Sequence, residues 1–429
     1  MSLSSVMSNA VSALQAQSTA LSNISTNLSN SGTTGYKAVG TSFADLMTEQ
    51  SSSTSYYGGG VTATAAQAIT TQGTISSASS DTDLAINGNG LFVVSNSASG
   101  GNTYYTRDGE FSEDSNGYLE LNSKYYLMGW PTDSSGNIES SDTSSTSGLE
   151  AVNLNRYSTS ASATTKVSLS ANLPASASSG AAYTSSVSVY DSLGASETVP
   201  MVWTKGSTSN EWTLTLENPE NSTGTTTGTL SGTTSYDVTF NSDGTLASLT
   251  DSAGNAVSTA TISVGSWTDG SSASSITLNL GSSGGNSGLT QYTTSSNAVT
   301  VSSSTSDGYA YGTLSGVSVG TDGTVTATYS NGKSIPIYKI AVATFANENG
   351  LSSLSGDVYA QTSASGDYTL NQAGSGGAGT LESEALESST VDTSTEFSKM
   401  ITAQQAYSAA AQLLTAANSM YQTLEQSVR

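Results

Sequence analysis

The chain opens with MSLSSVMSNAVSALQAQSTALSNISTNLSNSGTTGY, residues 1–36, and this stretch decides the fold. It contains no Asp, Glu, Lys, Arg or Pro. Within it, residues recur in alternating steps of four and three, and this spacing predicts a long amphipathic helix with a heptad seam. Gly32 and Gly35 end the pattern. The seam consists of Leu3, Met7, Ala10, Leu14, Gln17, Leu21, Ile24 and Leu28, with Gln17 as its polar member.

A second helical pattern occupies the C-terminal residues. Thr393, Ser394, Thr395 and Glu396 resemble a capping box, which predicts the start of a helix there. Two long amphipathic helices at opposite ends, with no long helix between them, are expected to pair with each other. The second seam consists of Phe397, Met400, Gln404, Tyr407, Ala411, Leu414, Asn418, Tyr421 and Val428, and Ile401 and Leu424 widen it.

The other faces of both predicted helices carry Ser, Asn, Gln, Thr and Ala, where a soluble coiled coil carries Glu and Lys. One interpretation is a helical hairpin within the chain. The other is that these uncharged faces contact further copies or line a lumen. Because Ser and Asn have low helix propensity, we expect the two ends to be disordered in the monomer and to fold on assembly.

The residues between the helices are predicted to form β structure, because turn signals recur between short apolar runs. The fold class is therefore α+β, mainly β, with several antiparallel β domains and paired terminal helices. The turn signals are Asn87-Gly88, Asp108-Gly109, Asn116-Gly117, Asp243-Gly244, Asp322-Gly323 and Asn331-Gly332, and the clearest strand-like runs are 84–86, 91–94, 187–190, 199–203, 212–216 and 337–345.

Composition excludes several classes of function. Asp and Glu outnumber Lys and Arg by 33 to 10, and the net charge of −23 argues against nucleic acid and anionic membranes as partners. No apolar run approaches the ~20 residues of a membrane helix, so no membrane insertion is expected. The chain has no His and no Cys, which removes catalytic triads, His-ligated metals and disulfides. We expect no catalytic, metal or cofactor site and no enzyme, although chemistry by carboxylates alone stays open.

Short motifs, in order along the chain, resemble those of the flagellar rod and hook family. Residues 27–37, NLSNSGTTGYK, are similar to its N-I-A-N-x-x-T-x-G-[FY]-K, and residues 43–46, FADL, to its F-x-D-L. Residues 83–94, 105–111, 349–351 and 386–392 are similar to further family motifs, and 190–194 with Trp212 to one of the outer domain. Gln405 and Ala410 stand where the family has Arg and Asn. The signature residues are Asn27, Asn30, Thr33, Gly35, Tyr36, Lys37, Phe43, Asp83, Gly88, Gly90, Arg107, Gly109, Gly350, Leu386, Glu387, Val391, Asp392 and Gln404.

This resemblance implies a structural subunit that polymerises into the tubular flagellar hook, the flexible joint that transmits torque from rod to filament around a central channel. It implies an inner helical domain at 1–36 and 385–429, a connecting segment at 37–71, a middle β domain at 72–149 and 310–384, and an outer β domain at 150–309. The residues expected to mediate helix pairing and assembly are Leu3, Met7, Leu14, Leu21, Ile24, Leu28, Phe397, Met400, Ile401, Tyr407, Leu414, Tyr421 and Leu424.

The implied partners are other copies of the chain, the distal rod, hook cap and hook–filament junction proteins, and the flagellar type III export apparatus. The implied location is the extracellular part of the flagellum. The first residues carry no basic residue and no continuous apolar core, so they do not resemble a cleavable signal peptide.

Several alternatives stay open. A distal rod protein of the same family would lack a large outer domain, whereas a secreted β-rich adhesin would lack matched terminal helices; a carboxylate-dependent glycosidase would need an acid–base pair that nothing marks. Gly88-Asn89-Gly90 is interpreted as a β-turn and not a phosphate loop. Asp81 and Asp83 are interpreted as a solvated loop and not a calcium site. Arg107 would pair with a neighbouring subunit's carboxylate or make a local turn contact.

Overall fold

The structure is a computed structural model that describes residues 3–47, 58–157, 159–294 and 297–427. It divides into two compact units. Unit 1 comprises Met1–Arg156, Val317–Ala327 and Ile335–Arg429, and unit 2 comprises Tyr157–Gly316 and Thr328–Ser334. The predicted outer domain, 150–309, overlaps unit 2, and the finer division of the rest into helical, connecting and middle domains remains a prediction.

The elements in chain order are as follows. The N-terminal part contains α1 (Leu3–Ser29), β1 (Val39–Met47), β2 (Gly58–Gln67), β3 (Ile75–Ser77), β4 (Leu84–Asn87), β5 (Leu91–Ser95), β6 (Thr103–Thr106), β7 (Phe111–Glu113), β8 (Leu119–Leu121), β9 (Tyr125–Pro131), η1 (Thr146–Gly148), β10 (Glu150–Ala151) and η2 (Leu154–Tyr157). The central part contains β11 (Thr159–Ser162), β12 (Lys166–Pro174), β13 (Ala182–Tyr190), β14 (Ser196–Lys205), β15 (Glu211–Leu216), β16 (Gly228–Leu230), β17 (Ser235–Phe240), β18 (Leu246–Asp251), β19 (Ala256–Val257), β20 (Ala260–Trp267), β21 (Ser274–Asn279), β22 (Leu289–Tyr292) and β23 (Thr300–Ser306). The C-terminal part contains β24 (Tyr309–Val319), β25 (Thr324–Tyr329), β26 (Ser334–Phe345), η3 (Glu348–Gly350), β27 (Ser352–Leu354), β28 (Val358–Ala360), β29 (Tyr368–Gln372), β30 (Thr380–Ser383), β31 (Ala385–Glu387) and α2 (Thr393–Ser427).

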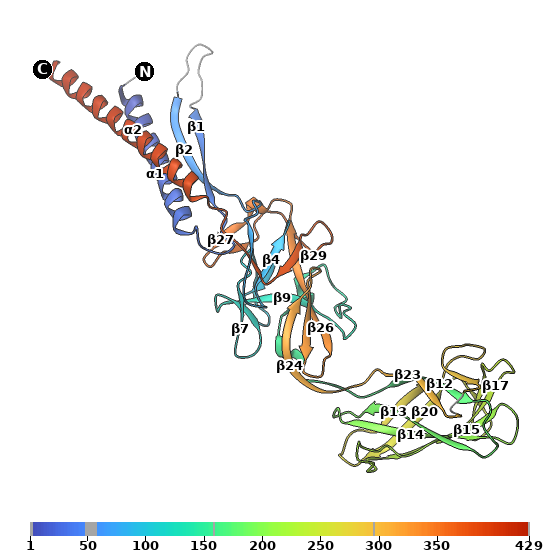
Figure 1. Cartoon of the computed structure of the whole chain (residues 1–429). Coiled ribbons are helices and arrows are strands. Elements are labelled where there is room, and N and C mark those ends of the chain that lie inside the picture. Colours follow the sequence, from blue (N-terminus) through green and yellow to red (C-terminus); the bar gives the residue numbers. More distant parts are fainter. Residues whose placement is uncertain (1–2, 48–57, 158, 295–296, 428–429) are drawn as a thin grey trace. The chain divides into compact units, whose positions relative to one another are not determined.

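The predicted pairing of the terminal helices is confirmed. Helices α1 and α2 lie side by side and antiparallel, so that both ends of the chain lie at the same end of the pair (Figure 1). The antiparallel hairpin of β1 and β2 covers another side of α1. Helix α1 therefore lies between α2 and the hairpin, and the fold class predicted from the sequence is confirmed.

The remainder of unit 1 is a β layer whose core is built from the predicted strands. Strands β26, β9, β5, β6, β28 and β27 follow one another in one sheet. Its core cluster includes Leu91, Val93, Tyr105 and Trp130, all buried. Strands β3 and β4 pair with β31 and β30, so the N-terminal and C-terminal halves of the chain are joined by hydrogen bonds just before α2 begins.

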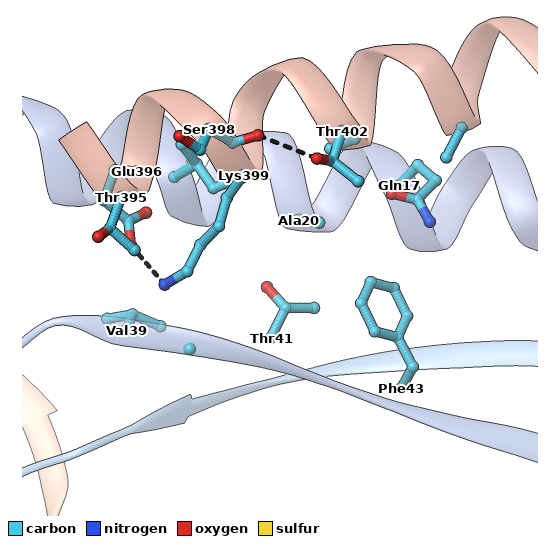
Figure 2. Close-up of a pocket in the computed structure, with 14 residues that line it drawn as sticks. Gln17, Ala20, Val39, Thr41, Phe43, Thr395, Glu396, Ser398, Lys399 and Thr402 are labelled. Carbon is cyan, nitrogen blue, oxygen red and sulfur yellow. Dashed lines mark hydrogen bonds and ion pairs between the residues drawn. The ribbon is translucent and has the colours of Figure 1, made fainter. Parts of the chain in front are cut away.

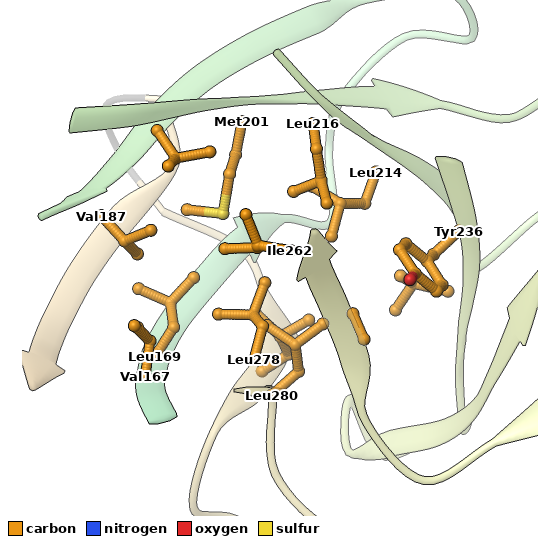
Figure 3. Close-up of a cluster of buried hydrophobic side chains, with 14 of the residues drawn as sticks. Val167, Leu169, Val187, Met201, Leu214, Leu216, Tyr236, Ile262, Leu278 and Leu280 are labelled. Atoms are coloured by element: carbon orange, nitrogen blue, oxygen red, sulfur yellow. The ribbon is translucent and has the colours of Figure 1, made fainter. Parts of the chain in front are cut away.

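Unit 2 contains two six-stranded sheets that enclose one large apolar core. Strand β14 alternates buried and half-buried or exposed positions along its ten residues, as expected for a strand with one face on a core. Figure 3 shows part of this core, where Val187, Met201 and Leu214 face Leu169, Ile262 and Leu278. One detail differs from the prediction of antiparallel pairing: β12 runs parallel to both β21 and β22.

Candidate assembly surfaces and the anchor of the terminal helices

The end of α1 is fixed by a buried asparagine from the signature motif. Asn27 Nδ2 donates to the Val39 carbonyl oxygen (2.9 Å) and to Glu396 Oε2 (3.2 Å). Its Oδ1 accepts from the Val39 backbone N–H (2.8 Å) and the Tyr36 hydroxyl (3.2 Å). All four contacts of one side chain thus join α1, the start of β1 and the first turn of α2. An aliphatic replacement would leave several of these buried polar groups without a partner.

A buried ion cluster ties the chain beyond α1 to the segment that precedes α2. Glu387 Oε1 lies 2.5 Å from Lys37 Nζ and accepts from the Gly73 N–H (2.6 Å), and Glu387 Oε2 lies 3.3 Å from Arg107 Nη1. The side chains of Lys37, Arg107 and Glu387 are buried. Burial lowers the pKa of Lys37, and the nearby Glu387 carboxylate opposes that shift. Removal of one member would leave uncompensated buried charge, so the cluster holds both terminal segments on the β layer.

Of the two roles considered for Arg107, a pair with a neighbouring subunit or a local turn contact, its contacts match the second. Its side chain is buried, and besides Glu387 it donates from Nη2 to the Gly88 carbonyl oxygen (2.8 Å) and from Nη1 to the Ile86 carbonyl oxygen (3.4 Å). The local turn contact is therefore confirmed, whereas pairing with a neighbouring subunit is wrong, because burial removes Arg107 from the surface. The Gly88-Asn89-Gly90 segment is a connection between β4 and β5, and both its glycines adopt positive φ.

Gly35 and Asp108 form a tight contact between the end of α1 and the β layer. Gly35 has φ +68°, and a Cβ there would lie 2.6 Å from the Asp108 backbone nitrogen. The Gly35 N–H also donates to the Glu387 carbonyl oxygen (2.7 Å). Burial raises the pKa of Asp108 to about 7, and the nearby carboxylates of Asp357 and Glu110 add to the shift. This joint therefore contains an acid whose charge is disfavoured by the folded chain.

The other signature residues have varied surroundings, and two of the glycines lie against the backbone of another segment. A Cβ at Gly109 would lie 1.7 Å from the Leu84 carbonyl oxygen, and one at Gly350 would lie 2.6 Å from the Ala364 backbone. Asn30 Oδ1 accepts from the Thr33 hydroxyl (3.2 Å) at the end of α1. The prediction of a solvated loop holds for Asp81, which is exposed, but is wrong for Asp83, which is buried and whose pKa is raised by that burial. Leu386 and Val391 are half-buried, and Gln404 and Phe43 are exposed.

The start of α2 differs from the predicted capping box. Asp392 Oδ1 accepts from the Thr395 N–H (2.9 Å), so Asp392 and not Thr393 caps the helix. Glu396, the expected return partner of the box, is buried and instead contacts Asn27 and Lys399. The sequence allowed both arrangements, and the tertiary contact with Asn27 decides between them.

The predicted seam of α2 is wrong for most of its large residues. The buried positions of the helix are Glu396, Ala403, Ala410 and Ala417, in steps of seven. Small alanines allow α1 to approach closely, and the apolar side chains assigned to helix pairing lie elsewhere. Met400 and Leu414 are half-buried, whereas Phe397, Ile401, Tyr407, Tyr421 and Leu424 are exposed. On α1, Ile24 is buried and Met7, Leu14, Leu21 and Leu28 are half-buried, whereas the burial of Leu3 and the structure of Val428 lie outside the described residues.

Exposed apolar residues are therefore concentrated on α2. Phe397 is 50% exposed, Ile401 57%, Leu413 59% and Met420 55%. A groove of about 570 Å³ lies between α2 and β1, with α1 as its floor (Figure 2). In Figure 2, Phe43 and Thr41 of β1 face Thr402 of α2 across this groove.

Sequence reasoning missed the alanine seam, the capping role of Asp392 and the groove. Ala403, Ala410 and Ala417 repeat at the heptad spacing, and that signal was available. Asn349, whose Oδ1 accepts from the Ile69 N–H (2.8 Å), was visible only as part of a motif. In the part of the chain that is described, no group of three metal-ligating side chains gathers, and no helix has the length and hydropathy to cross a membrane.

Four family models match segments in order along the chain, and together they cover more than half of it. The flagellar basal body rod protein model matches residues 7–37, the flagellar hook protein FlgE/F/G D1 domain model residues 85–171, the flagellar basal body protein FlaE D2 domain model residues 153–309, and the flagellar basal body rod FlgEFG protein C-terminal model residues 382–427. Among curated proteins, the flagellar hook protein FlgE of Brucella suis is 33% identical over 413 residues, which is 95% of each chain. The chain belongs to the flagellar hook protein family.

Other members of the hook family agree with this assignment. The flagellar hook protein FlgE of Escherichia coli is 31% identical over 439 residues, covering 97% of this chain and 98% of the relative. The crystal structure of Helicobacter pylori flagellar hook protein FlgE2 covers 73% of this chain and 100% of its own, with a TM-score of 0.53 and 14% identity, and therefore supports the fold alone. The chain is a structural hook subunit of the flagellum.

Proposed function

We propose that this hook-family chain self-assembles through its terminal helices into the tube of the flagellar hook. The observation that carries the proposal is the position of the large apolar side chains of α2, which face solvent in the single chain. Phe397 and Ile401 lie one helical turn apart on α2 and are both exposed. Neighbouring exposed apolar residues are typical of interaction sites.

The rest of the proposed role concerns transport and partners. The subunit leaves the cell through the flagellar type III export apparatus, and it meets distal rod, hook cap and hook–filament junction proteins at the ends of the tube. Freedom from disulfides supports export as an unfolded chain. The uncharged outer face of α2 contains Gln404, Gln405, Ser408 and Gln412, and it suits a channel lining for passing subunits.

The outer β unit is proposed to make the weak contacts that let a bent joint turn. Most of its large apolar residues are used in its own core, with a few exceptions such as Leu193 and Tyr311, and its surface is rich in small Ser and Thr side chains. Such a surface forms no deep interlocking contacts, so neighbouring copies slide at low cost. The straight, rigid distal rod is the second candidate, but the outer-domain match at 153–309 and the hook relatives favour the hook.

The test compares the full chain with two variants by negative-stain electron microscopy in high sulfate, which strengthens apolar burial. Phe397→Ser with Ile401→Ser removes two exposed apolar side chains of α2. Leu193→Ser with Tyr311→Ser, at 61% and 55% exposure in unit 2, is the matched control.

Curved tubes are expected from the native chain, tubes of the same or altered curvature from the control, and no tubes from the α2 variant. Straight tubes would favour the rod, once straightening by the salt itself has been excluded at lower sulfate. A native chain that stays monomeric, with and without preformed tube ends as seeds, would contradict the proposal.

A further inference from the structure

The groove between α2 and β1 is apolar along most of its length. Its floor is Gln17, Ala20 and Ile24 of α1, and Val39 and Phe43 belong to its β wall. Only two of its lining residues are charged, Glu396 and Lys399. Figure 2 shows that the Lys399 side chain lies at one end of the groove, where its Nζ is 2.7 Å from Glu396 Oε1. More than half of the Lys399 side chain remains accessible.

The last two turns of α2, residues 420–426, have the complementary chemistry. Met420 and Tyr421 are 55% and 56% exposed. Among the described residues of α2 the charged side chains are Glu396, Lys399 and Glu425, so this end of the helix carries a single acid. Glu425 is exposed and makes no ion pair within the described residues. Within its described residues the tip is thus a partly apolar surface with one negative charge. The groove is a mainly apolar channel whose accessible cation, Lys399, pairs with the buried Glu396.

Tip and groove cannot meet within one chain. Glu425 follows Lys399 by 26 positions on one continuous helix, which separates the two by about 39 Å at 1.5 Å per residue. Because the tip and the groove lie far apart on the same helix, the tip of one copy can contact only the groove of another copy. Such a head-to-tail contact does not close on itself unless a rotation closes a ring, and it generates an open polymer.

We propose that the α2 tip of one copy, residues 420–426, seats in the groove between α2 and β1 of a second copy, with Glu425 beside Lys399. This inference rests on the proposed function, since it names the contact through which the copies join. A polar–apolar helix end laid into an apolar groove follows a recurrent mode of recognition. With the α2 helices of the two copies parallel, this contact sets a displacement of about 39 Å along α2 between joined copies.

A double-mutant cycle on the critical concentration for polymerisation tests the charge contact. The variants are Lys399→Gln, Glu425→Gln and the pair together, with Glu113→Gln, an exposed acid of β7, as the control. Assembly is driven by sucrose at low ionic strength, because high salt would screen the pair. Each single variant is expected to raise the critical concentration about two- to fivefold. Because either change alone removes the charge contact, the double variant is expected to have a critical concentration no higher than that of the single variant that assembles less well.

Two further outcomes separate this inference from the proposed function. Tyr421→Ser is expected to raise the critical concentration about tenfold or more, whereas Gln422→Ser is expected to match the native chain. If the native chain polymerises but the two charge effects multiply and Tyr421→Ser behaves as Gln422→Ser, the tip–groove contact is wrong and assembly proceeds elsewhere. The fold-changes of Lys399→Gln and Glu425→Gln would multiply in the double variant if Lys399 contacted only Glu396 of its own chain and not Glu425 of another copy. If the native chain never polymerises, both proposals fail.

Discussion

The outer β unit and the terminal helices use their large apolar residues in opposite ways. In unit 2, Trp203 and Trp212 are fully buried between two sheets. In α2, Phe397 and Ile401 face solvent while alanines occupy the buried seam. Burying a methyl group gives roughly a third of the hydrophobic gain of a large side chain, so the helix pair has a weak core of its own. The comparison therefore predicts that unit 2 is stable alone and that the helices depend on neighbouring copies.

The largest expected effect lies in the core of unit 2. Trp212→Ala removes a fully buried indole that packs against Tyr183, with ring centroids 5.9 Å apart. We expect a loss of about 3–5 kcal/mol of unfolding free energy, measured by urea denaturation with tryptophan fluorescence. Tyr292→Ala, at an exposed position, should change stability by less than about 1 kcal/mol. Equal effects of the two variants would contradict a self-sufficient core.

Glu387→Gln tests the anchor between the helices and the β layer. The variant leaves the buried charges of Lys37 and Arg107 without their carboxylate. We expect a loss of about 3–5 kcal/mol in unit 1, together with faster proteolysis near residues 30–37 and 388–392, while unit 2 unfolds as in the native chain. Glu382→Gln, whose partner Asn87 lies in an exposed contact, is the control. Unchanged proteolysis would show that the cluster does not hold the terminal segments.

The pH dependence of unit 1 should reflect Asp108. Its pKa is raised to about 7 in the folded chain by burial, from an ordinary value of 3.8. The folded state therefore binds the Asp108 proton more tightly than the unfolded state does. The stability that this proton contributes is fully present below pH 4 and is lost as the pH rises to about 7. Asp108→Asn should remove this loss. Its free energy of unfolding should exceed that of the native chain by an amount that grows with pH to at most about 4 kcal/mol above pH 7.

Urea denaturation at pH 4.5, 6 and 7.5 measures the Asp108 effect. Glu113→Gln, at an exposed position, should give a difference from the native chain that does not change with pH. A gain from Asp108→Asn that is equal at all three values would show that the Asp108 charge is not what the fold disfavours.

The smallest expected effect concerns the alanine seam. Ala410→Leu places a larger side chain where α1 and α2 approach closely, and we expect a loss of about 1–2 kcal/mol in helix pairing. Ala409→Leu, one position away on an exposed face, should be nearly neutral. Helical ellipticity during thermal unfolding of the assembled tubes distinguishes them. A stabilising Ala410→Leu would show that large side chains, and not alanines, suit the buried seam of α2.

The sequence was sufficient for the β strands and for the existence of both helices. Strands such as β14 and β15 alternate apolar and polar residues with period two, and helices α1 and α2 have long heptad patterns, so local spacing determined them. The face of α2 that pairs was not predictable from hydrophobicity. A helix in a polymer can contact other elements of its own chain and neighbouring copies. The larger side chains of α2 do not lie in the contact with α1 of its own chain.

The buried anchor was equally hidden from local patterns. Lys37 and Glu387 are 350 residues apart, and Arg107 and Glu387 are 280 apart. Their motifs could be recognised one by one, but no spacing rule brings them together. The pairing of β3 with β31 carries Glu387 to Lys37, so the cluster follows from the topology and not from any single segment.

Hydrogen exchange of the monomer and of the assembled tube tests the central claim most directly. Amides of β12–β15 in unit 2 should be protected equally in both states. Amides of α1 and α2 should exchange rapidly in the monomer and slowly in the tube, because neighbouring copies complete their packing. Helices that are as protected in the monomer as in the tube would show that they need no partner, and would contradict the account.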